Sequence, residues 1–263
     1  MIHEDITLGP VRLIRGDCTL IAPTLERGSV TLLWTDPPYG HSNHDGDLND
    51  RLNQHREIES APIANDGPDE MRAVMDSMLT SFLPTLRDDC CCCCCCCCGG
   101  GGPRPTFAWV ASRMDEKGLS FFHSVIWDKR NPGLGWRFRR QHEMVMVAHK
   151  KGGKLAWSNP DAAVPNVISI TPPRDRVHPN EKPLQLVERF ITWTTSQGDV
   201  VLDPFMGSGT TLIAAIRTGR RAIGIEIDER HFRTAVDRVK RELAQPMLPA
   251  IAPTVAKQQD LIA

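Results

Sequence analysis

The chain lacks a long apolar run. Nowhere do about 18 apolar residues follow one another, so no segment is expected to cross a membrane. The first residues, MIHEDITLGPVRL, lack the basic and apolar stretches of a secretory signal peptide. An excess of charge is also missing, since 31 Lys and Arg stand against 32 Asp and Glu in 263 residues. We therefore expect a cytoplasmic protein, and only local clusters of charge can indicate a nucleic-acid partner.

Cysteine is scarce outside one tract, because nine of the ten cysteines are consecutive, at residues 90–98. Neighbouring cysteines cannot join distant parts of a fold through disulfides. Three interpretations remain: a metal-binding tract, a sequence artefact, or a buried strand. Metal sites space their ligands with intervening residues, whereas free cysteine is among the most buried residue types. The tract also follows an expected helix, so we predict a buried strand here.

Short apolar runs alternate with amphipathic segments along the chain, which is the pattern of an α/β fold. Strands are expected at 11–16, 30–36, 120–127, 143–150, 199–204 and 221–227. Several of them are apolar enough to be buried on both faces of a parallel sheet. Helices are expected at 20–27, 68–87, 105–116, 183–196, 210–218 and 228–243. The segments 41–67 and 150–177 are expected to be irregular.

A glycine-rich turn, DPFMGSGT at residues 203–210, joins an expected strand to an expected helix. Glycines let the backbone approach a ligand closely, and the helix N-terminus offers free N–H groups to a carboxylate or phosphate. Taken alone, the turn fits an ordinary strand-to-helix connection equally well. Glu226 ends the next strand, where an acid can accept hydrogen bonds from both hydroxyls of a ribose. Together, the turn and the acid predict a nucleotide-like ligand.

A second motif, DPPYG at residues 36–40, ends the strand expected at 30–36. Ligand sites of open α/β sheets lie at the carboxyl ends of strands. Two prolines fix the backbone of the turn, so the acid before them and the ring after them are held rigidly. An ordinary proline turn with a capping Asp fits the same residues. A rigid acid beside an aromatic ring also suits a flat base that stacks on Tyr39 while its amino group donates to Asp36.

The two motifs resemble those of the DNA methyltransferases that modify exocyclic amino groups. The first, DPPY, is similar to their catalytic motif, and the second is similar to their cofactor motif, FxGxG. The order along the chain, with the catalytic motif first, is similar to the permuted beta class, and the resemblance extends in outline over residues 11–240. It implies an α/β, Rossmann-like, S-adenosylmethionine-dependent methyltransferase fold that is circularly permuted. Its sheet would be mixed and seven-stranded, with helices on both faces.

Two further segments gain a role through this resemblance. HPNEKP at residues 178–183 is similar to the segment HPTxKP of that class, although it departs in its third and fourth residues. The resemblance implies that Lys182 or His178 helps to hold the methionine part of the cofactor; the segment also suits a helix cap at Asn180. Asp17 lies in a segment similar to the one whose acid meets the cofactor adenine. The expected cofactor-binding residues are Asp17, His178, Lys182, Asp203, Pro204, Phe205, Gly207, Ser208, Gly209, Thr210 and Glu226.

Basic residues gather between Asp128 and Lys154, where eight Lys and Arg stand beside only two acids, Asp128 and Glu143. Interleaved aromatic residues suit base stacking, although a solvated hairpin end has a similar composition. Because the family resemblance puts its target-recognition region between the catalytic and HPTxKP motifs, we assign that role to 129–177. The expected DNA-binding residues are Lys129, Arg130, Trp136, Arg137, Arg139 and Arg140.

The activity implied by the resemblance is site-specific methylation of N6 of adenine in double-stranded DNA, with the target base flipped out of the duplex. In the family, Asp at the first catalytic position leans to adenine and Ser leans to cytosine N4. The alternatives are methylation of cytosine N4, methylation of a protein glutamine or a small molecule, and a DNA-binding module without activity. No metal is expected to take part. The expected catalytic residues are Asp36, Pro37, Pro38 and Tyr39.

We expect one catalytic domain over residues 1–244, with 129–177 as an insertion for target recognition. The tail, 245–263, is expected to be disordered because prolines recur in it without apolar periodicity. A homodimer is compatible with these features. The sequence leaves open which DNA site is recognised. It also leaves open whether the enzyme belongs to a restriction-modification system, a phage or a cell-cycle regulator.

Overall fold

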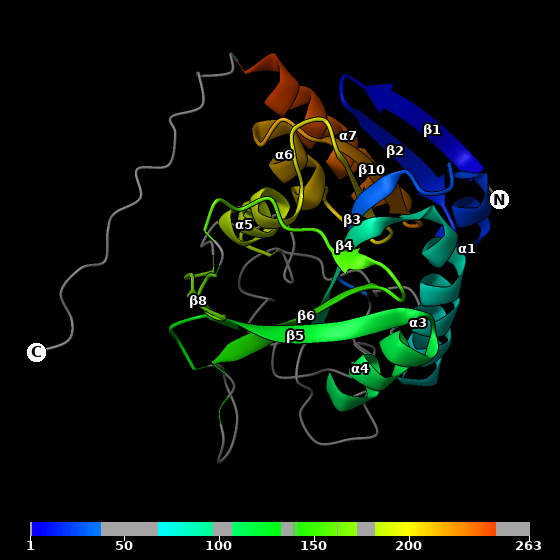
Figure 1. Cartoon of the computed structure of the whole chain (residues 1–263). Coiled ribbons are helices and arrows are strands. Elements are labelled where there is room, and N and C mark those ends of the chain that lie inside the picture. Colours follow the sequence, from blue (N-terminus) through cyan, green and yellow to red (C-terminus); the bar gives the residue numbers. More distant parts are fainter. Residues whose placement is uncertain are drawn as a thin grey trace, which may run out of the picture.

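The fold is seen in a computed structural model, in which ten strands form one mixed sheet (Figure 1). The structure describes residues 2–37, 68–96, 107–132, 139, 141–161, 163–172 and 182–245. The strands are β1 (Ile2–Leu8), β2 (Val11–Gly16), β3 (Val30–Thr35), β4 (Leu86–Cys96), β5 (Leu119–Asp128), β6 (His142–Lys150), β7 (Lys154–Leu155), β8 (Val167–Ser169), β9 (Val200–Asp203) and β10 (Arg221–Glu226). The helices are α1 (Cys18–Ile21), α3 (Pro68–Phe82), α4 (Phe107–Glu116), α5 (Leu184–Thr194), α6 (Thr210–Arg217) and α7 (Glu229–Ala244).

The strand order is β1-β2-β10-β9-β3-β4-β6-β5-β8, and β7 pairs with β4. Strands β2, β10, β9, β3 and β4 are parallel neighbours, while β6 runs antiparallel to both β4 and β5. The predicted α/β class with a mixed sheet is therefore confirmed. The described sheet has three strands beyond the seven expected, and these are the peripheral strands β1, β7 and β8.

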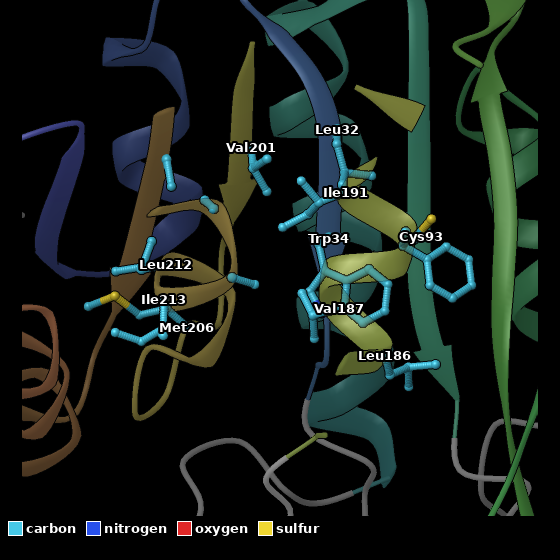
Figure 2. Packing of buried hydrophobic residues seen from close by; sticks show 14 of the residues in the cluster. Leu32, Trp34, Cys93, Leu186, Val187, Ile191, Val201, Met206, Leu212 and Ile213 are labelled. Carbon is cyan, nitrogen blue, oxygen red and sulfur yellow. The ribbon is translucent and has the colours of Figure 1, made fainter. Parts of the chain in front are cut away.

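Helices cover both faces of the sheet, and each face has its own apolar core. One core packs α5, α6 and α7 against the sheet, and the other packs α1, α3 and α4 against the opposite face. Figure 2 shows the first core, in which Trp34 of β3 lies beside Val187 and Ile191 of α5. The ring centroids of Trp34 and Phe190 are 5.2 Å apart. The structure thus confirms the prediction of helices on both faces.

The cysteine tract forms the greater part of β4, in the centre of the sheet. Because successive side chains of a strand point to opposite faces, Cys91 and Cys93 enter the core beneath α5, whereas Cys92 and Cys94 enter the core beneath α3. The cysteines at 90–95 are all buried and reduced. The prediction of a strand is confirmed up to Cys96 and its burial up to Cys95, and the last two cysteines lie outside the described residues.

Several boundaries differ from the expected ones. The helix expected at 20–27 is only the short α1 followed by a 3₁₀ turn at Ala22–Thr24. The helix expected at 68–87 ends at Phe82, because Pro84 stands at the start of a further 3₁₀ turn, Leu83–Thr85. Strand β1 was not expected at all, since IHEDITL is polar and stands at an edge of the sheet, where its side chains remain exposed or half-buried.

The segment assigned to target recognition contains a strand of the central sheet. Strand β6 lies within 129–177 and pairs with β4 and β5 over most of its length. The segment is therefore not a separate insertion as a whole. The recognition role assigned to 129–177 remains a prediction. No helix of the described residues is long and apolar enough to span a membrane.

Candidate active site

Four acids gather along one edge of the sheet. Strands β2, β10, β9 and β3 are adjacent and parallel, so their carboxyl ends meet at the same edge. These ends carry, in the same order, Asp17, Glu226, Asp203 and Asp36. Adjacent strands lie about 4.8 Å apart, so neighbouring loops can contact a single ligand. The sheet thus brings the predicted catalytic and cofactor motifs together although 166 residues separate Asp36 from Asp203 in the sequence.

The glycine-rich turn is fixed by the two acids that flank it in space. Asp203 accepts hydrogen bonds from the N–H of Phe205 at 3.0 Å and from the hydroxyl of Thr211 at 2.5 Å. Glu226 accepts one from the N–H of Gly207 at 3.0 Å. Its other oxygen accepts one from the N–H of Asp228 at 2.8 Å. The turn after β9 and the end of β10 therefore form one rigid unit.

Two glycines of the turn have conformations that other residues rarely adopt. Gly207 has φ +50°, and a Cβ atom added to it would meet no described atom within 4 Å. The backbone there faces open space, as a cradle for a ligand requires. Gly209 has φ +85°, and its added Cβ atom would lie only 3.1 Å from the Cβ of Ala235. Gly209 therefore serves the close packing of α6 on α7, and a role for Gly207 in cofactor binding remains a prediction.

Arg238 of α7 braces the turn from behind. Its guanidinium donates to the carbonyl of Ser208 at 3.0 Å and to the Ser208 hydroxyl at 2.6 Å. A third contact, of 3.4 Å, reaches the Thr210 hydroxyl. The predicted cofactor residues Ser208 and Thr210 thus have side chains engaged with the protein itself. What the turn offers a ligand is chiefly its backbone.

Two acids at this edge, Asp203 and Glu226, are buried deeply enough to change their proton affinity. Burial raises the pKa of Asp203 to about 7, and the neighbouring carboxylates of Asp36 and Glu226 add to the rise against the hydrogen bonds from Thr211 and Phe205. Burial also raises the pKa of Glu226, against the hydrogen bonds that it accepts from the backbone. The carboxyl groups at this edge can therefore exchange hydrogen bonds with the hydroxyl groups of a ligand.

Asp17 caps the short helix α1. Its Oδ1 atom accepts hydrogen bonds from the N–H of Thr19 at 2.8 Å and from the Thr19 hydroxyl at 2.7 Å. A carboxylate has about four lone-pair positions, so capping leaves it capacity to accept from a ligand. The structure thus places Asp17 beside the end of β10, and its contact with the cofactor adenine remains a prediction.

Asp36 belongs to a chain of opposite charges that crosses the site. Its Oδ2 atom lies 2.7 Å from the Nζ of Lys182, a residue that comes just before α5 in the chain. The same ammonium forms an ion pair with Oε2 of Glu143 at 3.3 Å, and Lys129 contacts the other oxygen of Glu143. Burial by itself would raise the pKa of Glu143, but Lys182 and Lys129 outweigh it and lower the pKa to about 2. Lys182 thus contacts the carboxylates of both Asp36 and Glu143.

Glu143 was not among the residues that we expected in the site. It begins the buried part of β6, and Val145 and Val147 share its face of the strand, within the core beneath α5. A charged residue in register with buried ones needs a charged partner. The alternation of Glu143 with the apolar Val145 and Val147 is the signal in the sequence that this acid is buried. The excess of Lys and Arg in the surrounding segment obscures that signal.

Three of the predicted DNA-binding residues can be described. Lys129 is engaged by Glu143, and its Nζ also lies 5.2 Å from the ring centroid of Trp127. Arg130 is exposed and adopts the left-handed backbone conformation with φ +60°. Arg139 donates to the carbonyl of Pro132 at 3.1 Å. Lys129 therefore points toward Glu143, whereas Arg130 and Arg139 are exposed to solvent. Trp136, Arg137 and Arg140 lie outside the described residues.

Some other predicted residues cannot be placed. Pro38, Tyr39 and His178 lie outside the described residues, as do the segment 41–67 and the tail after Gln245. Pro37 is described, and it is buried directly after Asp36. The N-cap of α5 is Pro183 and not Asn180 as expected, and its ring offers no capping side chain. The helix begins later than the capping interpretation required.

The sequence is similar to known DNA-modifying enzymes. A family model for N6 and N4 methyltransferases, described as DNA methylase, matches residues 30–237. YubD of Escherichia coli (strain K12), which carries the name of a methylase, is 29% identical over 238 residues, which cover 87% of this chain and 89% of YubD. The type II methyltransferase M2.DpnII of Streptococcus pneumoniae is 32% identical over 150 residues, which cover 51% of this chain and 56% of that protein.

The fold is similar to that of solved methyltransferases. The complex of M1.HpyAVI with S-adenosylmethionine superposes with a TM-score of 0.63 at 24% identity, covering 87% of this chain and 99% of that chain. The PvuII DNA methyltransferase, which is cytosine-N4-specific, superposes with a TM-score of 0.67 at 18% identity, covering 88% of this chain and 90% of that chain. These likenesses confirm the Rossmann-like methyltransferase fold that the motifs implied.

Proposed function

Because the chain belongs to the N6/N4 DNA methylase family, we propose that it transfers a methyl group to N6 of adenine in DNA. The predicted cofactor is confirmed, since S-adenosylmethionine is the methyl donor of this family. The observation that carries the proposal is the position of Asp36. It lies at the carboxyl end of β3, next to β9, whose following turn has an open backbone at Gly207.

The residues at the edge fit S-adenosylmethionine. The cofactor carries a positive sulfonium, a ribose with two hydroxyls and a carboxylate, and it supplies an activated methyl group. Glu226, a buried acid at the end of β10, would accept from the ribose, and Asp17 would meet the adenine end of the cofactor. The open backbone at Gly207 would allow close approach. His178 and Lys182 were expected to hold the methionine part, and this remains a prediction.

The target amine needs alignment more than it needs a strong base. The exocyclic nitrogen of adenine is a poor nucleophile, because its lone pair is delocalised into the ring. We propose that the carboxylate of Asp36 and the carbonyl of Pro37 accept the two amino hydrogens, which draws the nitrogen toward tetrahedral geometry. Its lone pair then points toward the methyl group. Tyr39, held by Pro38, would stack on the base after the base has left the duplex.

Adenine is preferred to cytosine on the strength of one residue. Asp36 occupies the position where the family resemblance associates Asp with adenine and Ser with cytosine N4. Methylation of cytosine N4 is the second candidate, because its geometry is the same and the PvuII enzyme shares the fold. Methylation of a protein glutamine or a small molecule would leave the basic segments around β6 without a role.

Target recognition is assigned to the segments on either side of β6. In this proposal Lys129, Arg130 and Arg139, with Trp136, Arg137 and Arg140, contact the phosphates and bases of the duplex. Three further features also remain predictions: the single domain of residues 1–244, the disordered tail and a homodimer. Recognition would therefore occur at the edge of the sheet that carries Asp36, because β5 ends and β6 begins there.

One experiment separates the candidates. The protein is incubated with S-adenosylmethionine labelled on the methyl group and with duplex DNA of diverse sequence, and the nucleosides are identified by mass spectrometry after digestion. Labelled N6-methyladenine supports the proposal, and labelled N4-methylcytosine establishes the second candidate. Label in none of the nucleosides would contradict both.

A further inference from the structure

We infer that Glu143 is a positioning residue for the methyl transfer, because it fixes the Lys182 ammonium that orients the Asp36 carboxylate. The inference rests on the proposed function, in which Asp36 binds the target amine. It adds a residue that neither motif contains, from a strand that follows Asp36 by more than 100 residues. Its grounds are the distances, the burial and the topology around Lys182.

The topology explains how β6 can reach the site. Because β6 runs antiparallel to β4 and β5, its amino end lies at the edge where the parallel strands have their carboxyl ends. Glu143 therefore stands at the same edge as Asp36, with β4 between their two strands. Lys182 reaches this edge from the amino end of α5, which packs on the face that Glu143 shares. The ammonium is thus placed between two carboxylates from two strands.

Burial makes the arrangement specific. The side chain of Lys182 is 6% exposed and that of Glu143 is 10% exposed, while Asp36 retains 21%. A buried charge without a partner is strongly unfavourable, so the ammonium must stay near both carboxylates. Only Asp36 of the three is open enough to meet a substrate. The pair of Glu143 and Lys182 is therefore a support behind the catalytic acid.

Fixing the ammonium at two points restricts the Asp36 carboxylate. A lysine side chain has four rotatable bonds, and one ion pair leaves its end free to rotate. The terminal torsion of an Asp side chain is also broad. Lys182 Nζ donates a hydrogen bond to Asp36 Oδ2 at 2.7 Å, and its ion pair with Glu143 Oε2 at 3.3 Å restricts where the ammonium can lie and so the direction from which Asp36 is held. The carboxylate plane is then set before the base arrives.

A purely structural role for Glu143 makes a different prediction. If Glu143 only stabilised the core, its loss would reduce the amount of folded protein and leave the chemistry of folded molecules unchanged. If it positions Asp36, its loss lowers the rate of the chemical step while binding of cofactor and DNA is retained. The two roles are separated by single-turnover kinetics on folded protein.

The test uses Glu143→Gln, measured at saturating S-adenosylmethionine and DNA, with both affinities determined separately. We expect the single-turnover rate to fall on the order of tenfold to a hundredfold, as for a small misplacement of a reacting group. Glu143→Asp retains the charge and should recover part of the rate. Val145→Ala is the matched control, because it removes buried atoms from the same face of β6 without changing a charge, and its rate per folded molecule should equal that of wild type.

A double-mutant cycle with Lys182→Gln tests the route of the effect. Because Glu143 acts through Lys182, Glu143→Gln should change the rate little when Lys182 is already replaced. Additive losses, or a wild-type single-turnover rate for folded Glu143→Gln, would overturn the inference. Asp36→Ala, measured alongside, keeps the two proposals apart. If Asp36→Ala is inactive and Glu143→Gln is fully active, only the positioning role fails, whereas an active Asp36→Ala removes the proposed function itself.

Discussion

The carboxylate of Glu226 accepts a hydrogen bond from the backbone N–H of Gly207 at 3.0 Å. This contact joins the acid that ends β10 to the turn that follows β9, across 19 positions of the sequence. The acid and the turn therefore hold each other before a ligand arrives. Preorganisation of this kind lowers the cost of binding, and it makes the turn sensitive to small changes in shape.

Replacing Gly207 should abolish cofactor binding. In Gly207→Val the new side chain would fill the open space over the turn, so we expect the affinity for S-adenosylmethionine to fall by at least on the order of a hundredfold, with most of the fold retained. Isothermal titration calorimetry measures the affinity. Gly28→Val is the control, because Gly28 also has a positive φ and open space around its Cβ position, but it lies before β3, at the opposite edge of the sheet. Unchanged affinity in folded Gly207→Val would remove the turn from the cofactor site.

Asp203 should make the stability of the protein depend on pH. Its pKa in the folded state, about 7, is raised above its ordinary value of 3.8 mainly by burial. Between about pH 4 and pH 7, Asp203 therefore keeps a proton in the folded state that it has lost in the unfolded state. The associated stability is fully present below about pH 4 and disappears as the pH rises through 7.

We expect Asp203→Asn to gain stability relative to wild type as the pH rises from 5 to 8, on the order of 3 kcal/mol in total. Urea unfolding at each pH measures the difference. Asp237→Asn, at an exposed position of α7, should give a curve parallel to that of wild type. If Asp203→Asn also ran parallel, the burial of a protonated Asp203 would be refuted.

The arginines before β6 should supply phosphate contacts. Replacing Arg137, Arg139 and Arg140 together by Gln should weaken binding to any duplex and reduce the salt slope of binding by about 2 to 3. The affinity for S-adenosylmethionine should not change. Fluorescence anisotropy at several salt concentrations gives the slope. The same slope as wild type would mean that these arginines form a solvated surface and that recognition lies elsewhere, such as in 41–67.

The sequence was sufficient to predict the strands and the site where local pattern and topology agree. Continuous apolar runs predicted strands such as β3 and β9, and the cysteine tract could be assigned to β4 because metal ligation and disulfides were both unsuited to consecutive cysteines. Parallel neighbours then require their carboxyl ends to meet, so two motifs far apart in sequence could be assigned to one site. Asp228, expected as the cap of the last helix, accepts from the N–H groups of Arg230 and His231.

The rest depended on tertiary contacts that no local pattern contains. The ion pair of Glu143 with Lys182 joins β6 to the residues just before α5, and it places Lys182 beside Asp36, a position that the motif alone did not indicate. Lys129, which was expected to contact DNA phosphates, forms an ion pair with the buried carboxylate of Glu143. Strand β1 was missed because an exposed edge strand has little apolar alternation. In each case the deciding neighbour lies elsewhere in the chain.

The most direct test of the account is the single-turnover rate of methyl transfer to duplex DNA by Asp36→Ala. If the carboxylate holds the amine most strongly as the nitrogen becomes tetrahedral, its loss should slow the chemical step by at least on the order of a hundredfold to a thousandfold. The affinities for S-adenosylmethionine and DNA should stay close to those of wild type, because other residues make those contacts. A folded Asp36→Ala protein that methylates adenine at nearly the wild-type rate would contradict the catalytic assignment.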